Sequence, residues 1–300
     1  MASIDDLEAV VSLIVATATA SKKVFKLSKQ SYRTIPYNSN RMLSWDKPVE
    51  IQTLPIFPFA RVGAIGDGNC MLHSILFCLS PTYRTLAMPG RQFVADKWRS
   101  VLIARTDDLK DQADIMYFDI GGWGALEESF DRLPIKRKEL DIEMAPLIAR
   151  LYGHNCLAIQ ISATLLPKPV EITLRGFDSS MPTVLINYLG GDTNAGASAA
   201  GSYYTSGHYE AIISVAFSRK ATTSSSEVRT RRAIASSIAK SVTAKLAKKK
   251  APRFTVKSLK GALHLLDDAH TQYTFTSAEL EEPFLKMFRA AAIASAAYIN

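Results

Sequence analysis

The chain has 300 residues, a formal net charge of +8 and 47% apolar residues, with three cysteines and five histidines. This length and apolar content are typical of a globular chain with one or two domains and an ample core. Three cysteines exclude a disulfide-stapled secreted scaffold and favour a reducing, intracellular and cytoplasmic setting. The cysteines and histidines show no paired ligand spacing such as Cys-x-x-Cys, so we expect no structural zinc and no cofactor.

The first 54 residues form a separate N-terminal arm in this interpretation. Its apolar stretch, residues 9–16, follows acidic residues rather than a basic region. We therefore expect a packed helix and not a signal peptide, and no stretch of the chain reaches the length of a membrane span. The turn-rich residues 32–40 are expected to run extended along the surface, either as part of a substrate channel or as a contact with a neighbouring protomer.

The most informative feature is an Asp-Gly-Asn-Cys run at residues 67–70, at the start of an apolar stretch that is predicted to form a helix. A helix N-terminus carries partial positive charge and free N–H groups, which favour a thiolate, so Cys70 is a candidate nucleophile. Asn69 is a good N-cap residue, and Gly68 can adopt a positive φ. The loop from Asp67 to Asn69 could then direct its N–H groups to one point beside the sulfur, as an oxyanion hole.

A candidate general base, His208, lies far along the chain at the start of a β-rich run. Residues i and i+2 of a strand share a face, which puts the Glu210 carboxylate beside His208, where it could orient the imidazole. A Cys with a distant His is the layout of a cysteine hydrolase. Taken singly, a Cys in an apolar run is usually inert core, and a lone His is usually a satisfied structural residue.

The remaining cysteines and histidines near these motifs are expected to be structural. Cys78 and Cys156 lie in apolar runs and are predicted to be small buried hydrophobic residues. His73 and His154 are predicted to pack or to form hydrogen bonds. Cys70 and His208 are therefore the cysteine and the histidine that we consider for the chemistry.

Several motifs resemble those of the OTU (ovarian tumour) family of cysteine proteases. Residues 66–74, Gly-Asp-Gly-Asn-Cys-Met-Leu-His-Ser, are similar to its nucleophile motif, and residues 207–210, Gly-His-Tyr-Glu, to its closing motif of His followed by an aromatic. Residues 143–159 resemble the family's helix that leads into a buried strand, and the pair that begins at Trp123 resembles its Trp-Gly element. In order and spacing the resemblance covers about residues 55–218.

The resemblance implies a role for each motif residue. Cys70 would be the nucleophile, His208 the general base, and Asp67 with the loop through Gly68 and Asn69 would shape the oxyanion hole. The implied substrate is ubiquitin or a ubiquitin-like protein, cut after its C-terminal Gly-Gly, which makes the chain a deubiquitinase. Glu210 is a departure, because the family more often has Asp or Asn there, and this bears on rate more than on reaction type.

The order of predicted elements indicates an α+β fold. The expected elements after the nucleophile helix are a helical region over 91–152 and strands at 157–161, 171–174, 183–188 and 210–217. The OTU resemblance implies a papain-related core, with a small sheet between helical layers and the site at one edge. A long loop of small residues, 191–204, comes shortly before His208, and we expect it to grip substrate through Gly191, Tyr203 and Tyr204.

The positive charge is concentrated in one segment. Residues 219–260 hold 13 Lys and Arg against one acid, so this segment carries +12 and the rest of the chain −4. A polar linker at 221–228 separates the catalytic domain, 55–220, from a basic and mostly helical region, 229–300.

A basic amphipathic helix is predicted within residues 229–260. Its alternatives are a helix packed on its own protein with a solvated charged face, a contact with nucleic-acid phosphates or an anionic membrane surface, a partner groove, and a nuclear-import signal. Further on, the box from Thr276 to Glu279 and an apolar helix that begins at Pro283 predict that the C-terminal region docks on the catalytic domain or self-associates with another copy.

Three functions follow as hypotheses. The leading one is a ubiquitin-directed cysteine isopeptidase, favoured by Cys70 and His208. The second is a viral structural or nucleic-acid-associated protein whose OTU-like domain has weak or lost activity, and Glu210 and the basic segment leave room for it. The third is a protease that processes proteins of its own virus. A viral protein would act in the host cytoplasm or in the virion.

Overall fold

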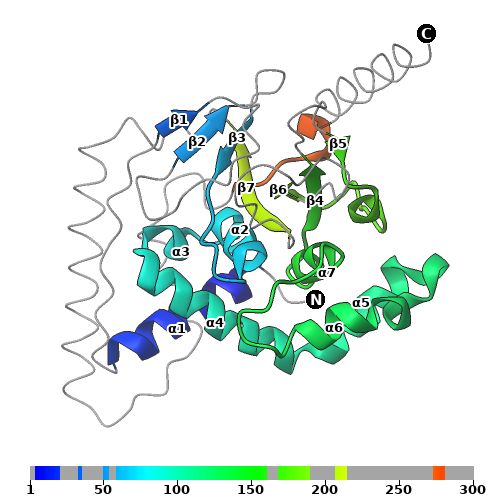
Figure 1. Ribbon diagram of the computed structural model, residues 1–300, viewed down its shortest axis with the longest axis horizontal. Coiled ribbons are helices and arrows are strands. Elements are labelled where there is room, and N and C mark those ends of the chain that lie inside the picture. Colours follow the sequence, from blue (N-terminus) through cyan, green and yellow to red (C-terminus); the bar gives the residue numbers. More distant parts are fainter. Residues whose placement is uncertain are drawn as a thin grey trace, which may run out of the picture.

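The computed structural model describes residues 4–20, 33–35, 50–53, 59–160, 168–189, 207–214 and 273–280 (Figure 1). These residues form a mixed α and β arrangement, which confirms the predicted α+β class at that level. Much of the basic C-terminal region, with the linker 221–228 and the predicted helices around 229–260 and after Pro283, lies outside the described residues, as does the turn-rich arm apart from residues 33–35.

Among the described residues, strands form one seven-stranded sheet in the order β1-β2-β3-β7-β6-β4-β5. The strands are β1 (Arg33–Ile35), β2 (Glu50–Thr53), β3 (Phe59–Val62), β4 (Asn155–Gln160), β5 (Lys168–Pro169), β6 (Thr183–Leu189) and β7 (His208–Ser214). β7 lies between β3 and β6 and is antiparallel to both, whereas β4 and β6 are parallel. The strand that begins at His208 is therefore central, with hydrogen-bonded neighbours on both sides.

The helices gather largely on one side of the sheet in Figure 1. They are α1 (Ile4–Ala20), α2 (Cys70–Leu79), α3 (Pro81–Thr85), α4 (Met88–Ala104), α5 (Thr106–Met116), α6 (Glu127–Arg132) and α7 (Met144–Arg150), with 3₁₀ turns η1 (Phe118–Ile120), η2 (Gly122–Leu126) and η3 (Glu171–Leu174). The predicted N-terminal helix is confirmed: α1 packs on α4 and α3 and buries Leu7 and Val11. None of the described helices has the length and apolarity needed to cross a bilayer.

The predicted strands at 157–161, 183–188 and 210–217 correspond to β4, β6 and β7, while the strand predicted at 171–174 is wrong. That segment forms η3, because its backbone bonds close locally: the N–H of Thr173 donates to the carbonyl of Val170 at 2.9 Å. The Thr173 hydroxyl also accepts from the N–H of Ala158 in β4. A short run of β-branched residues does not distinguish a strand from a turn in sequence alone. Here the backbone of the run forms the hydrogen bonds of a 3₁₀ turn.

The centre of the fold is α2, every residue of which is buried. A helix that is apolar all round must be enclosed by other elements. One side of α2 packs on β7 and β6, where Ala211, Ile213 and Ile186 belong to the same apolar cluster, and its other sides contact α1, α3, α4 and α7. This enclosure fixes the helix, and with it the residue at its N-terminus.

The opposite face of the sheet carries a smaller apolar cluster, formed by Leu157, Ile159, Leu185 and Ile212 with two residues of the C-terminal segment, Phe275 and Leu280. The Phe275 backbone exchanges two hydrogen bonds with Thr183 of β6, at 2.8 and 2.9 Å. The short segment 273–280, which follows the basic region in sequence, therefore docks on the sheet, as Figure 1 shows beside β4 and β6.

The predicted capping box within this segment is confirmed. Glu279 Oε2 accepts from both the N–H and the hydroxyl of Thr276, at 2.7 and 2.9 Å, and the Glu279 N–H donates back to the Thr276 hydroxyl. The Tyr273 N–H donates to the Cys78 carbonyl at the end of α2, and the Tyr273 ring lies under the Arg84 guanidinium, 4.2 Å from ring centroid to Cζ. The segment thus bridges α2 and β6.

We expect Phe275→Ala to lower the free energy of unfolding by about 3 kcal/mol, because it removes a buried ring and leaves a cavity beside Ile212. Urea unfolding followed by far-UV circular dichroism measures this. Thr274→Ala, at the half-buried neighbouring position, is the control and should change stability little. Equal stability of the Phe275 variant and the wild type would mean that the segment contributes no net packing energy.

Candidate active site

Cys70 is the first residue of α2, as predicted. The loop before it turns at Gly68, whose φ of 82° is in the left-handed region that favours glycine. Glycine is also required by space: a Cβ on Gly68 would lie 1.7 Å from the backbone oxygen of Arg137. The loop thus passes directly beneath a second loop, around residues 133–143, and only glycine fits between them.

The predicted capping role of Asn69 is wrong. The residue stands at the N-cap position, but its side chain makes no capping hydrogen bond. Instead Nδ2 donates to Asp96 at 2.8 Å and Oδ1 accepts from Arg99 Nη1 at 2.8 Å, both on α4. The Asn69 side chain therefore connects the loop before Cys70 to α4. These residues are far apart in sequence, so a capping pattern cannot reveal the contact.

Arg99 connects the two loops of the site. Besides its bond to Asn69, the guanidinium donates to the carbonyls of Leu133 and Arg132, each at 2.8 Å. Asp96, one turn away, accepts from Arg137 as well as from Asn69. Arg99 and Asp96 were not identified as site residues from the sequence. The only indication in the sequence was an arginine on α4, a helix that must bury one face.

The Cys70 sulfur lies against the start of β7. Sγ is 4.0 Å from the carbonyl oxygen of Gly207, so the fold brings the two predicted motifs together. Burial raises the pKa of the Cys70 thiol to about 12, although the N–H groups of Tyr209 and Met71 oppose this shift. The expectation that the helix N-terminus favours a thiolate is therefore not met here, because desolvation outweighs it.

His208 occupies the first position of β7 and is 6% exposed. Its Nε2 lies 3.9 Å from Glu210 Oε1, so the two side chains share one face of the strand as predicted, but the separation is too long for a hydrogen bond. Nε2 is buried and bonds to no other described residue, and no hydrogen bond joins the described imidazole to the described Cys70 thiol. Burial, helped by Arg61 and His73, lowers the His208 pKa against the raising effect of Glu210.

Glu210 has a partner that the sequence reading missed. Arg61 of β3 contacts Glu210 Oε2 through Nη2 and Nε, each at 2.6 Å, and both side chains are 0% exposed. Two orientations of the Asn187 amide differ here. The one that satisfies both ends accepts from Arg61 Nε at 3.2 Å, and the reverse places Nδ2 3.3 Å from Glu210 Oε2. In either orientation Asn187 lies beside the buried pair of Arg61 and Glu210.

Asp67 anchors its own loop. Its Oδ1 accepts from the Asn69 N–H at 3.1 Å and from His73 Nε2 at 3.0 Å. Burial raises the Asp67 pKa, but His73 and the Asn69 N–H outweigh it, so the net pKa is below the ordinary value. A carboxylate only accepts, so Asp67 shapes the loop before Cys70 without donating to it. Because Asp67 takes the Asn69 N–H, the donors left in this loop are those of Gly68 and Cys70.

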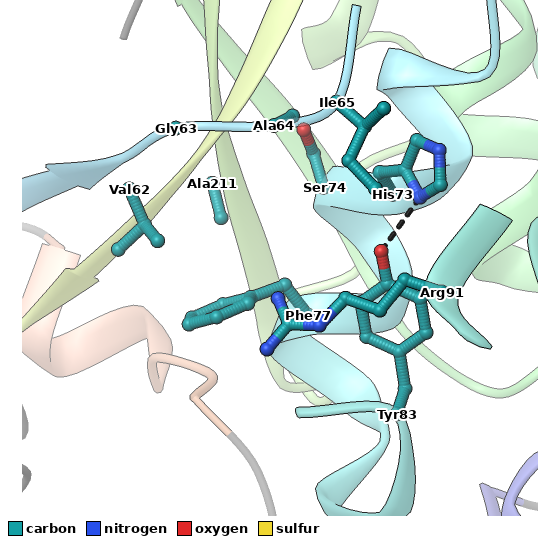
Figure 2. Close-up of a pocket in the computed structure, with 10 residues that line it drawn as sticks. All are labelled: Val62, Gly63, Ala64, Ile65, His73, Ser74, Phe77, Tyr83, Arg91 and Ala211. Atoms are coloured by element: carbon teal, nitrogen blue, oxygen red, sulfur yellow. Dashed lines mark hydrogen bonds between the residues drawn. The ribbon is translucent and has the colours of Figure 1, made fainter. Parts of the chain in front are cut away.

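His73 continues this chain of hydrogen bonds into the core. Its Nδ1 lies 2.6 Å from the Tyr83 hydroxyl, as Figure 2 shows. Burial lowers the His73 pKa, so the neutral ring fits best, with Nε2–H donating to Asp67 and Nδ1 accepting from Tyr83. The histidine is thus a hydrogen-bonding residue, as predicted.

The cavity in Figure 2, bounded in part by His73, Ser74 and Arg91, measures about 10 Å³. This is room for about one water molecule, so the cavity is no substrate pocket.

The remaining predicted residues fall into two groups. Cys78 and Cys156 are free, buried thiols, as expected of structural residues. Gly191, Tyr203 and Tyr204 of the predicted substrate loop lie outside the described residues. Within the described part of the chain, no group of three or more His, Cys, Asp or Glu side chains could hold a metal ion.

Gly68→Ala should lower the free energy of unfolding by more than about 1 kcal/mol, because alanine disfavours the positive φ and its Cβ would strike the Arg137 carbonyl. Gly124→Ala is the matched control, since nothing lies within 4 Å of its added Cβ and its φ is not positive. Thermal unfolding of the two variants measures the difference. Similar melting temperatures would contradict the close approach of the two loops.

The alkylation rate of Cys70 should rise about tenfold per pH unit from pH 7 to 10 without a plateau, because the thiolate reacts and the thiol pKa is about 12. Iodoacetamide labelling followed by peptide mass spectrometry measures the rate at this cysteine alone, and a free-cysteine peptide, which levels off near its own pKa, is the control. A plateau below pH 8 at Cys70 would show a stabilised thiolate.

Comparison of the chain with protein-family models, with curated proteins and with solved structures finds no match. The OTU resemblance therefore rests on motif residues such as Cys70 and His208, and on their order. The geometry adds one independent observation, because the two motifs meet at a helix N-terminus and a strand start.

Proposed function

We propose that the chain is a cysteine isopeptidase directed at ubiquitin or a ubiquitin-like protein. The observation that supports this most is the meeting of Cys70, at the N-terminus of a fully enclosed helix, with the strand start that carries His208. A nucleophile at a helix N-terminus that meets the strand start carrying a potential base is an arrangement from which covalent acyl transfer can be built. Both residues belong to rigid elements, which favours a productive geometry.

The protonation states suggest how the first step runs. The raised thiol pKa and the lowered imidazole pKa describe a neutral pair at neutral pH, not a preformed ion pair. His208 would take the thiol proton as Sγ attacks the carbonyl carbon, and the oxyanion would accept hydrogen bonds from the N–H groups of Gly68 and Cys70.

The later steps use the same groups, with His208 acting first as a general acid and then again as a general base. The imidazolium of His208 gives its proton to the leaving amine as the C–N bond breaks, which leaves a thioester on Cys70. His208 then takes a proton from water, whose oxygen attacks the thioester carbon. The C–S bond breaks, the thiolate regains a proton from the imidazolium, and the carboxylic acid product leaves.

The substrate class comes from the resemblance. The nucleophile motif at 66–74 and the closing motif at 207–210 both resemble those of a family whose usual substrate is ubiquitin. The enclosed sulfur, in a residue only 4% exposed, fits a slender acyl group such as a Gly-Gly end better than a bulky side chain. The basic segment remains a candidate for binding an anionic partner.

A second candidate is a domain of weak or lost activity that serves assembly or anchoring. It is favoured by the long separation between His208 and Glu210 and by the missing hydrogen bond between His208 and Cys70. Catalytic hydrogen bonds often tighten only when substrate binds, and this weakens the argument. The two candidates differ in whether the purified protein reacts with an activated ubiquitin.

We expect the wild-type protein to gain the mass of one ubiquitin when it is incubated with ubiquitin that carries a C-terminal electrophilic trap. Cys70→Ala should give no adduct, and His208→Gln should slow adduct formation by about 10²-fold or more. Cys78→Ala, a change of a buried thiol in the same helix, is the matched control and should react like the wild type. Intact-protein mass spectrometry follows the reaction.

The outcomes separate the two candidates. An adduct that depends on Cys70 would support the isopeptidase. No adduct from a sample that unfolds cooperatively would overturn it and leave the assembly role, or a protease whose substrate is not ubiquitin.

A further inference from the structure

The buried pair of Arg61 and Glu210 is not explained by the core of the fold. Both side chains are fully buried, and Arg61 Nη2 and Nε both contact the same oxygen, Oε2. A buried ion pair is weak evidence for stability, because desolvation offsets the attraction, so it invites a functional reading. The position of the ion pair indicates such a role, because the other carboxylate oxygen of Glu210, Oε1, faces His208 Nε2.

The sheet register explains why these side chains meet. Arg61 of β3 stands opposite Ile212 of β7, and side chains directly opposite each other project from the same face. His208, Glu210 and Ile212 alternate along β7, so they share that face as well. Register, rather than a flexible loop, therefore places the guanidinium beside the carboxylate.

We propose that Arg61 is a positioning residue of the active site, which acts on His208 through Glu210. By holding Oε2, Arg61 fixes the carboxylate and restrains it from closing on the imidazole. Glu210 thus orients His208 without forming a full ion pair with it, and the imidazole stays neutral and able to accept the Cys70 proton. The inference rests on the proposed function for its catalytic meaning.

The proposal gives a reason for the departure at Glu210. Glu is one methylene longer than Asp, so its carboxylate can reach Arg61 across the strand pair while one oxygen stays toward His208. A shorter acid would have to choose between these partners. The longer side chain of Glu210 and the buried Arg61 therefore act together to hold one carboxylate oxygen toward His208.

Several groups in the described elements act on His208. Glu210 on its own strand raises the imidazole pKa, and Arg61 on β3 lowers it, as does His73 on α2. Glu139, in the loop over Gly68, raises it. In the neighbouring strand β6, the apolar Leu189 stands opposite His208 and the uncharged Asn187 stands opposite Glu210. A substitution of Arg61 must therefore be compared with a substitution of Glu210, to show whether Arg61 affects the His208 pKa directly or through Glu210.

The test is an NMR titration of His208 in protein labelled at histidine, in the wild type and in three variants. Arg61→Gln should raise the His208 pKa by about one unit, because the released carboxylate can close on the imidazole. Glu210→Gln should lower it. In the double variant Arg61→Gln/Glu210→Gln, the loss of Arg61 should raise the His208 pKa much less than it does in the single variant, because only the direct charge effect of Arg61 remains.

Two controls accompany the titration. Arg61→Lys keeps the charge and should leave the His208 pKa near its wild-type value. Arg84→Gln changes another buried arginine, whose guanidinium bonds to the carbonyls of Phe77 and Cys78, and should not move it. If Arg61→Gln does not fold, Glu210→Gln, which nearly keeps the side-chain shape, still tests the coupling.

The results that would overturn the proposal are specific. One is an unchanged His208 pKa in folded Arg61→Gln or in Glu210→Gln. Another is an equal rise on removal of Arg61 with and without the Glu210 carboxylate, because this would mean that Arg61 acts directly. The titration needs no activity, so it stands apart from the adduct experiment. Where adducts form, the acid limb of the adduct rate should move with the His208 pKa.

Discussion

The enclosure of α2 is the constraint on which the rest of the structure depends. Its residues are mostly apolar and all of them are buried, so sheet and helices surround it, and β7 packs along it. This burial fixes the N-terminus of the helix against the start of β7 and so brings Cys70 to Gly207. The same burial removes water from the site, which sets the protonation of its groups.

Polar side chains then hold the loops around that fixed end. The loop before Cys70 is connected to α4, and to the loop around residues 133–143, by hydrogen bonds of Asn69, Arg99 and Asp96. Asp67 and His73 continue the network to Tyr83 in the core. Most of these buried groups are bonded, apart from Asp67 Oδ2, and such networks favour one arrangement because most others would leave more of the groups unpaired. The loop before Cys70 is therefore held by side chains of α2 and α4 and by the loop around residues 133–143.

Desolvation decides the character of the proposed chemistry. A helix N-terminus favours a thiolate, but the larger cost of burying the charge raises the thiol pKa, and the same cost lowers the pKa of His208. These shifts favour a neutral pair, and in the proposed reaction proton transfer would accompany attack. Glu210, shared with Arg61, supplies less negative charge to the imidazole than a free carboxylate would.

The sequence by itself determined the α+β class, the helix that begins at Cys70, the left-handed turn at Gly68 and the shared face of His208 and Glu210, because each follows from local periodicity or backbone sterics. It could not reveal Arg61 or Arg99 as site residues, nor the bonding of Asn69 to α4 instead of its own helix. These depend on sheet register and loop crossing between distant segments. Only the tertiary structure decided them, and with them the sign of the Cys70 pKa shift, because burial is a property of the whole fold.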